Sequence, residues 1–380
     1  MDTDVLVIGG GAAGLAAATR LRTHAPNLAV TLVNSTPYNV YRPWFMYALP
    51  HLVPPEDLRI PLADLAARYG FQFVQAEVDK LDAGSQTALA GDTSVRYRRV
   101  IVAAGAPTDQ HAVPGAAEHA VFPCDLAGFG EFQRRLDALH SGSVTFVLHG
   151  ERIGPGLEDA AWLARTRHAL TRPDIEVRLV DDGDGVLTQF GAAATDRLRR
   201  RLEGWGAHVV LGTRVASIDA ASVRLADGRV LPSTLTALVG ALTGPDLQTA
   251  DLTDAQGFFP VNSTLQSRYE PSVFAAGDAV AHGEHAVRKN WQRAVGQAYV
   301  AAENAARSLR GDPLVSYDDS RDRRLTKFSL PDVGGVAYLV WNQRLLSAGR
   351  AARRIRTTFD RKHFAAYLPA ADTRWKRMPG

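Results

Sequence analysis

The stretch Val5-Leu6-Val7-Ile8-Gly9-Gly10-Gly11-Ala12-Ala13-Gly14-Leu15 decides the fold of this chain. A short β-branched run ends in the pattern G-x-G-x-x-G, and an alanine-rich helical stretch follows without a break. In such a unit Gly9 permits the tight turn, Gly11 lets the backbone approach a pyrophosphate, and Gly14 lets the helix pack on the strand. The start of the helix adds backbone N–H groups and the positive end of the helix dipole. The stretch therefore predicts a dinucleotide-binding turn.

The residue that closes the next predicted strand, Ala29 to Asn34, refines this interpretation. A dinucleotide fold usually places Asp or Glu about twenty residues after the glycines, where it binds the ribose hydroxyls. This chain has Asn34 instead. An amide oxygen can still accept one such hydrogen bond, but it carries no charge. We therefore keep Asn34 in the predicted site and expect weaker binding of an adenosine ribose.

Length and composition restrict the class of protein. The chain has 380 residues, enough for two or three domains, and its 46% hydrophobic and 22% charged residues are typical of a soluble globular protein. We find no apolar run of eighteen residues and no recognisable signal peptide, so we expect a cytoplasmic protein without a membrane-spanning helix. The single cysteine, Cys124, excludes a disulfide within the chain and fits a reducing compartment. No metal site is predicted.

The net charge of +3 is distributed unevenly. From Arg321 to Gly380, fourteen Lys and Arg residues stand against four Asp residues, so the rest of the chain is acidic on balance. Within this basic segment, residues 343–359 can be wound as an amphipathic helix. Its apolar side consists of Leu345, Ala348, Ala352, Ile355 and Phe359. Such a helix suits an anionic lipid surface, or its apolar side packs on the protein or on a second subunit; both alternatives stay open. Nucleic acid is not expected, because no binding module is recognisable.

A second strand–turn–helix unit is predicted from Ser143 onward. Its turn carries glycines at irregular spacing, and the following strand, residues 175–180, ends in an acid at the ribose-binding place. These features predict a second nucleotide site, for NADH, that consists of Gly150, Gly154, Gly156, Glu158 and Asp181. The irregular turn leaves an alternative, which is a duplicated fold whose second site is vestigial.

Two further predicted strands end on turns of small residues. The strand Val95 to Val102 leads into Ala103-Ala104-Gly105, where the backbone can pass close to a flat ligand. The strand Val273 to Ala276 leads into Gly277-Asp278, and a helix is predicted from about Trp291 to Leu309. Asp278 would supply an acceptor for sugar hydroxyls. Each of these stretches, considered alone, is also consistent with a β-turn that binds no ligand.

Together, the glycine turn, the Val95–Gly105 stretch and the Val273–Asp278 stretch resemble the two-dinucleotide-domain flavoproteins, the FAD-dependent pyridine nucleotide oxidoreductases. The resemblance covers roughly residues 3–310, and type II NADH dehydrogenases and sulfide:quinone oxidoreductases are the most similar members. It implies an α/β fold with two Rossmann-like domains. The implied parts are a split FAD domain (1–115 and 246–312), an inserted second dinucleotide domain (116–245) and a basic C-terminal segment (313–380).

The resemblance also implies which residues contact the cofactor and the electron acceptor. Residues 292–297 resemble the A-Q-x-A-x-Q-Q signature that lies beside the flavin and the quinone, with Trp291 and Gly296 as departures. The implied FAD contacts are Gly9, Gly11, Ala13, Gly14, Asn34, Arg42, Pro43, Val78, Ala104, Gly105, Gly277, Asp278 and Gln292. Trp291 and Gln297 are implied to border the acceptor.

The departures from the family narrow the predicted chemistry. One cysteine provides neither the redox-active pair of the disulfide reductases nor the several cysteines of the sulfide enzymes. What remains is hydride transfer from NADH to FAD and on to a quinone-like acceptor, for which the flavin supplies the reactivity. One alternative is an FAD-dependent enzyme that oxidises a small organic molecule without NADH. The other is a flavin-containing scaffold.

The sequence identifies no catalytic acid or base, since His149, His282 and His285 are isolated histidines of the kind that are usually ordinary polar residues. The expected partners are a small-molecule electron donor and acceptor. Contact with the face of a membrane through the basic segment, and a homodimer, are further expectations.

Overall fold

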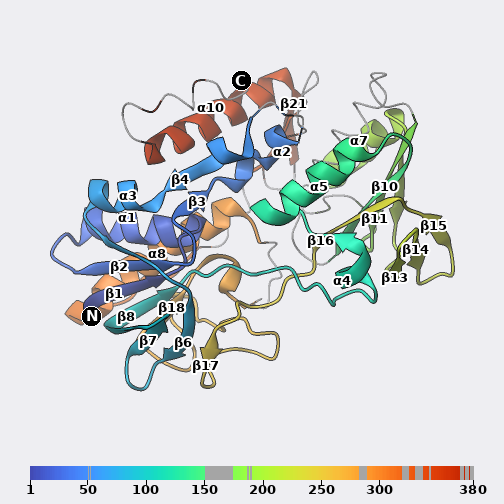
Figure 1. Cartoon of the computed structure of the whole chain (residues 1–380). Coiled ribbons are helices and arrows are strands. Elements are labelled where there is room, and N and C mark those ends of the chain that lie inside the picture. The colour runs from blue at the N-terminus through green and yellow to red at the C-terminus, as the bar shows by residue number, and fades with distance from the viewer. Residues whose placement is uncertain are drawn as a thin grey trace. The chain divides into compact units, whose positions relative to one another are not determined.

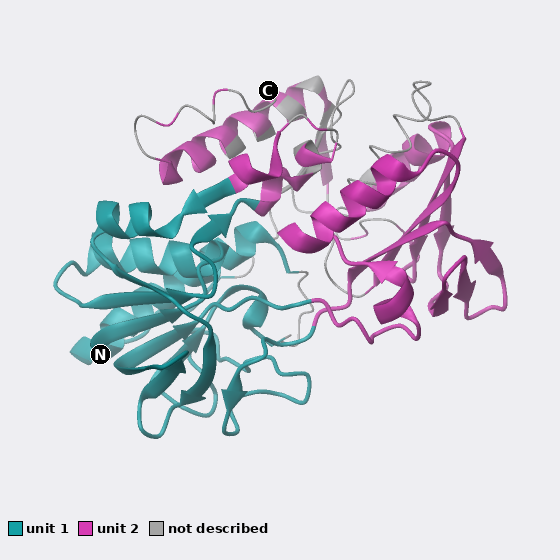
Figure 2. Cartoon of the chain, viewed as in Figure 1, with its two compact units in different colours: residues 1–41, 59–107, 243–322 teal, residues 42–58, 108–242, 323–380 magenta. Residues whose placement is uncertain are grey.

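A computed structural model of the chain describes residues 1–380 except 50, 52, 150–173, 186–187, 189–190, 282–288, 319–324, 330–336, 342–343, 369–371, 373–375 and 377–380 (Figure 1). The chain divides into two compact units (Figure 2). Unit 1 consists of residues 1–41, 59–107 and 243–322, and unit 2 of residues 42–58, 108–242 and 323–380. Each unit contains a sheet built around five parallel strands.

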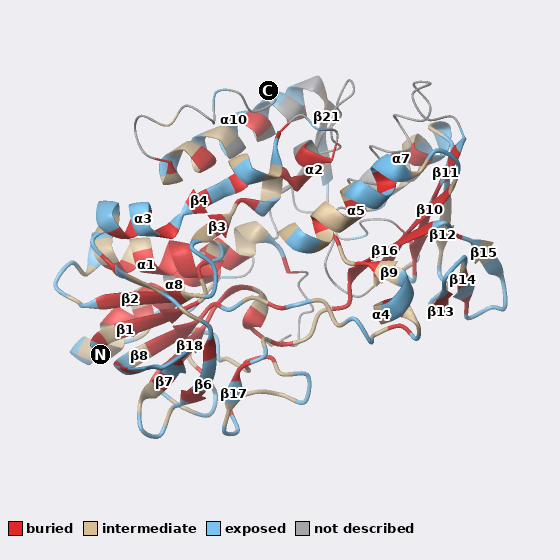
Figure 3. Ribbon diagram, viewed as in Figure 1, coloured by how far each residue is buried: buried red, intermediate tan, exposed pale blue. Residues whose placement is uncertain are grey.

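Five parallel strands form the centre of unit 1. Their order across the sheet is β5 (Gln72–Gln75), β2 (Val30–Asn34), β1 (Asp2–Ile8), β8 (Thr93–Val102) and β18 (Val273–Ala275). The strand that precedes the glycine turn is therefore central and buried on both faces, which explains its nearly continuous apolar sequence. Figure 3 shows buried residues concentrated along β1, β2, β18 and the second half of β8.

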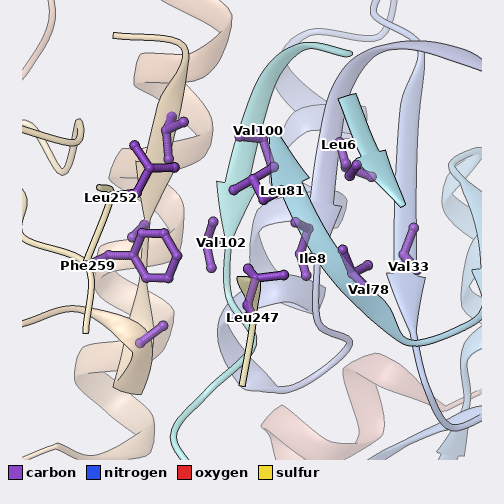
Figure 4. Close-up of a cluster of buried hydrophobic side chains, with 14 of the residues drawn as sticks. Leu6, Ile8, Val33, Val78, Leu81, Val100, Val102, Leu247, Leu252 and Phe259 are labelled. Atoms are coloured by element: carbon purple, nitrogen blue, oxygen red, sulfur yellow. The ribbon is translucent and has the colours of Figure 1, made fainter. Parts of the chain in front are cut away.

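One face of this sheet is covered by an antiparallel extension of the same sheet. The first half of β8 pairs with β7 (Thr87–Ala90), which pairs with β6 (Val78–Asp82), and β17 (Gln248–Thr249) lies along β6. Alternate residues of the parallel strands, among them Leu6, Ile8 and Val33, meet apolar side chains of the extension in one cluster (Figure 4). Leu81 and Phe259 belong to the same cluster and are almost fully buried.

Helices α1 (Ala12–His24), α3 (Leu62–Tyr69) and α8 (Trp291–Arg310) belong to unit 1, and α1 and α8 lie side by side (Figure 1). The buried positions of these two helices are mostly alanine, and Ala298 and Ala301 are fully inaccessible. Small side chains let two helix backbones approach closely. The alanine-rich composition of the predicted helix thus reflects contact with a helix nearly three hundred residues later in the chain.

Two predictions for unit 1 are wrong in detail. Helical spacing predicts a helix over residues 58–69, but Arg59–Pro61 forms β4, which pairs with β3 (Tyr38–Val40), and the helix begins at Leu62. Pro61 has no N–H and restricts the residue before it, so it lies outside the helix. The aromatic and proline-bearing residues 38–44 predict a loop, but they contain β3 and the 3₁₀ turn Arg42–Trp44.

Unit 2 contains a second, entirely parallel sheet. Its order is β12 (Ala207–Leu211), β11 (Ile175–Asp181), β10 (Gly142–His149), β16 (Leu235–Gly240) and β9 (Ala120–Val121). Helices α4 (Ala116–His119), α5 (Leu126–Ala138) and α7 (Ala192–Gly204) belong to the same unit, together with an antiparallel meander. The meander consists of β13 (Val215–Asp219), β14 (Ser222–Leu225) and β15 (Val230–Pro232). Two parallel sheets with helices confirm the predicted α/β class.

The C-terminal segment of unit 2 corrects another prediction. The helix predicted over residues 343–359 is instead strand β21 (Arg344–Gly349) followed by helix α10 (Arg350–Tyr367). Strand β21 pairs with β20 (Ala337–Trp341), which pairs with β19 (Leu325–Ser329). The break falls at Gly349, whose φ of +97° is incompatible with a right-handed helix. The predicted apolar stripe is therefore divided between a strand and a helix.

Residues 42–58 belong to unit 2, and described side chains of this range pack on its helices. Helix α2 (Phe45–Ala48) follows the 3₁₀ turn, and a second 3₁₀ turn spans Pro55–Leu58. The Trp44 ring lies 4.9 Å from that of Phe364 on α10, and the Phe45 ring lies 5.1 Å from that of Phe129 on α5. None of the helices among the described residues is long and apolar enough to cross a membrane.

Candidate functional site at the glycine turn of unit 1

The three glycines of the fingerprint have two different roles. Gly9 has a φ of +100°, and a Cβ there would lie 2.5 Å from the Ala103 carbonyl oxygen. A Cβ on Gly14 would lie 1.7 Å from the carbonyl oxygen of Gly9. Both positions are thus glycine because the chain itself leaves no room. Gly11 differs, since no atom lies within 4 Å of its would-be Cβ. The open space at Gly11 is where a ligand can approach the backbone.

Two asparagines hold the peptide groups of Gly10. The Gly10 N–H donates to Asn34 Oδ1 at 2.7 Å, and the Gly10 carbonyl accepts from Asn39 Nδ2 at 2.7 Å. Asn34 Nδ2 in turn donates to the carbonyl oxygen of Thr36 at 2.8 Å and to its hydroxyl at 3.0 Å. Asn34 therefore stabilises the turn itself, which is a role that the sequence did not reveal. Asn39 is buried, and the sequence carried no signal for it.

The strand end at Ala103–Gly105 lies directly beside the glycine turn. Ala103 N–H donates to the Ile8 carbonyl at 2.8 Å, which extends the pairing of β8 with β1. Gly105 has a φ of +79°, and the space around its would-be Cβ is open. Gly105 therefore offers a second open backbone position, on the segment that packs against Gly9.

The Gly277–Asp278 turn reaches the same place from the other end of the chain. Gly277 has a φ of +76°, and a Cβ there would lie 3.0 Å from Ala13 Cβ, on the first turn of α1. The Gly277 N–H donates to Gln297 Oε1 at 2.9 Å. The structure thus brings all three predicted stretches together, and it places Gln297 beneath the third as a buried support.

A small pocket opens at this turn. It is lined by Gly277, Asp278, Val280, Ala281, Lys289, Asn290, Arg293, Ala294 and Gln297. Asn290 caps α8, because its Oδ1 accepts from the N–H of Arg293 at 2.9 Å. Lys289 is buried, and its Nζ donates to the carbonyl oxygens of Asp278 at 2.5 Å and Val280 at 2.9 Å. Sequence reasoning missed both Lys289 and Asn290.

The other predicted site residues lie as follows. Val78 begins β6 and is buried in the cluster of Figure 4. Gln292 and Trp291 are half-buried at the start of α8, and the Trp291 ring lies 6.1 Å from that of Tyr41 at an angle of 71°. The exposed Arg42 and half-buried Pro43 lie in the first 3₁₀ turn, which belongs to unit 2.

Asp181 closes β11 in unit 2 as predicted, but the residue is only 6% exposed. One carboxylate oxygen accepts from the N–H of Gly183 at 2.9 Å. The remaining residues predicted for the second nucleotide site, Gly150, Gly154, Gly156 and Glu158, lie outside the described residues, as do His282 and His285.

These features define a dinucleotide-binding α/β protein whose first unit has the open turn, the small-residue strand end and the acidic turn of a flavin site. The chain belongs to the pyridine nucleotide-disulphide oxidoreductase family, whose model matches residues 3–305. It is therefore an FAD-dependent oxidoreductase. The residues of unit 1 fit FAD, because Gly11 and Gly105 leave room for a ligand and Asp278 lines a pocket at the Gly277 turn, which lies against Ala13 at the start of α1.

Individual relatives agree with this class. An NADH dehydrogenase-like protein of Mycobacterium tuberculosis is 28% identical over 376 residues, which cover 92% of this chain and 91% of that protein. The fold matches the sulfide:quinone oxidoreductase of Aquifex aeolicus with a TM-score of 0.86 at 19% identity, over 96% of this chain and 91% of that one. It also matches NDH2 of Plasmodium falciparum, solved in complex with NADH, with a TM-score of 0.77 at 14% identity, over 96% and 97% of the two chains.

Proposed function

We propose that this protein takes hydride from NADH onto FAD and passes the electrons to a quinone-like acceptor. The family membership carries the proposal, supported by the NADH dehydrogenase-like relative that spans nearly the whole chain. The fold-level neighbours, one named for sulfide and quinone and one solved with NADH, agree with a donor and acceptor of this kind. The single cysteine, Cys124, is buried, so sulfide chemistry through a cysteine pair does not apply within this chain.

When bound, FAD supplies the capacity to accept a hydride and to release its electrons to an acceptor. The chain's own residues bind and orient it. We assign the diphosphate to the open backbone at Gly11, where N–H groups at the start of α1 favour negative charge. We assign the hydroxyls of the flavin side chain to Asp278. Gln297 and Lys289 hold the backbone around Asp278, so the carboxylate starts from a fixed position.

We assign the adenosine ribose of NADH to Asp181 at the end of β11. An acid at this place repels a 2′-phosphate, so NADH should react in preference to NADPH. The acceptor is assigned to the start of α8, where Trp291 and Tyr41 form an aromatic pair. Trp291→Ala should then raise the KM for the quinone without releasing FAD.

A second candidate function is the oxidation of a small organic molecule with no role for NADH. The observation that favours it is that Asp181 is buried and its carboxylate already accepts a hydrogen bond from the N–H of Gly183. A ribose hydroxyl must therefore displace the hydrogen bond from Gly183 or donate to the carboxylate in addition to it.

Anaerobic stopped-flow mixing of the FAD-loaded protein with NADH, with NADPH and with neither nucleotide separates the two candidates. We expect saturable loss of flavin absorbance with NADH, weaker loss with NADPH, and reoxidation when menadione is added. Asp181→Ala should raise the apparent dissociation constant for NADH. If neither nicotinamide bleaches the flavin within minutes, the NADH proposal is wrong and the small-molecule candidate replaces it.

We also propose that α10 contacts the face of an anionic membrane. Its side chains divide into two sides: Phe364 is buried, whereas Ile355 and Phe359 are 49% and 42% exposed. Arg354 and Lys362 are exposed on the same helix. Exposed apolar side chains among cations suit the surface of an anionic bilayer. Cosedimentation with phosphatidylglycerol vesicles should fall when Ile355 and Phe359 are replaced by serine; unchanged binding would refute this contact.

A further inference from the structure

Lys289 is a buried cation in the pocket at the Gly277–Asp278 turn. The residue is 6% exposed, and its Nζ donates to two backbone carbonyls, those of Asp278 and Val280. The same nitrogen lies 3.6 Å from the centroid of the Phe258 ring. The ammonium group is therefore held by two oxygens and an aromatic face at a place where Asp278 also lines the pocket.

Burying a lysine to bind two carbonyl groups costs more desolvation free energy than burying a neutral donor. Removing an ammonium group from water opposes folding, and contacts such as those with the two carbonyl dipoles and the ring offset that cost. A neutral donor of suitable length would hold the same carbonyls with a smaller desolvation cost. What lysine adds over such a donor is its positive charge. Arg293 and Asp278 line the same pocket, so its charged side chains are two cations and one carboxylate.

We propose that Lys289 is a positioning residue for the 278–280 turn that also supplies a fixed positive charge to the flavin pocket, and so makes bound FAD easier to reduce. The proposal rests on the assignment of the flavin side chain to Asp278 made above. Two electrons and one proton, taken from the donor, convert FAD to a reduced form with one more negative charge. A nearby buried cation stabilises that form more than the oxidised one, because the low-polarity surroundings screen it weakly.

The test is the midpoint potential of FAD in the holoenzyme, measured by slow enzymatic reduction against a reference dye. This measurement needs neither NADH nor quinone. Lys289→Met should lower the midpoint potential by at least about 30 mV. For a two-electron couple this corresponds to a tenfold smaller ratio of the affinities for reduced and oxidised FAD, the preference for reduced FAD. Lys289→Arg keeps the charge and should restore most of that preference. Lys80→Met is the matched control, since it removes the same charge from an exposed strand position of unit 1.

Two results would overturn the proposal. One is a preference in Lys289→Met within twofold of the wild type, and the other is an equal loss in Lys289→Arg, which would leave Lys289 as a clamp alone. If Lys289→Met loses FAD during purification, titrating its apoprotein with oxidised and with reduced FAD gives the same ratio. A shifted potential in a protein that NADH does not reduce would refute the NADH proposal while leaving this one standing.

Discussion

Alanine substitutions at Gly11 and Gly14 should separate binding of the cofactor from integrity of the fold. At Gly14 the new Cβ would lie 1.7 Å from the Gly9 carbonyl oxygen, whereas real contacts essentially never fall below 3.0 Å. The turn and α1 must therefore separate by more than an ångström. Overpacking of this kind typically costs about 1–3 kcal/mol, and here backbone rather than a side chain has to move. We expect Gly14→Ala to lower the thermal midpoint of the apoprotein clearly.

At Gly11 the same substitution meets no atom within 4 Å, and the φ of −70° and ψ of −167° suit alanine. Alanine is a poorer N-cap than glycine, so we expect a loss of less than about 1 kcal/mol in the free energy of unfolding. The added methyl group fills the space assigned to the diphosphate. FAD affinity should fall at least tenfold, about 1.4 kcal/mol, in a flavin fluorescence titration of the apoprotein. Unchanged FAD affinity in Gly11→Ala, or an unchanged midpoint in Gly14→Ala, would refute this division of roles.

Three further predictions concern other residues of the two units. Asp278→Ala should weaken FAD retention on gel filtration more than Asp181→Ala, and equal flavin occupancy would show that the FAD is misplaced. Asn39→Ala should leave the buried Gly10 carbonyl without its side-chain donor, costing about 1–3 kcal/mol in urea unfolding and releasing FAD; full retention of both properties would contradict it. Burial raises the pKa of Tyr97 above its usual value, so its contribution to stability is complete below pH 10 and is lost as the pH rises further. Tyr97→Phe should therefore shift alkaline unfolding to higher pH, and an unshifted transition would count against this cause.

The fold of unit 1 could be predicted from the sequence where contacts between residues close in the sequence determine the structure. The glycines of the first turn are fixed by contacts a few residues away, such as that between Gly14 and Gly9, so their spacing already describes the geometry. Asn34 shows where this reasoning ends. Its position predicted a contact with ribose, but its partner is the peptide of Gly10, and position along a strand does not specify which neighbour a side chain bonds.

The residues that were missed depend on contacts between segments far apart in the chain. Asn39 and Lys289 act on backbone groups of other segments, and no spacing rule marks such pairs. The C-terminal error has the same origin. Residues 344–349 have a composition that permits a helix, and only the pairing with β20 makes them a strand. The helical periodicity of one segment contains no information about whether another segment pairs with it as a strand.

The position of β8 has a consequence for how the chain is made. Its second half pairs with β18, and Val100 pairs with Val273, which lies 173 positions later in the sequence. As the polypeptide leaves the ribosome, β1, β2, β5 and β8 are available long before their last neighbour. Until β18 emerges, the apolar edge at Val100–Val102 presents unpaired backbone groups, the kind of edge that promotes aggregation. Unit 1 therefore completes its sheet only after residues 108–242, the larger part of unit 2, have been synthesised.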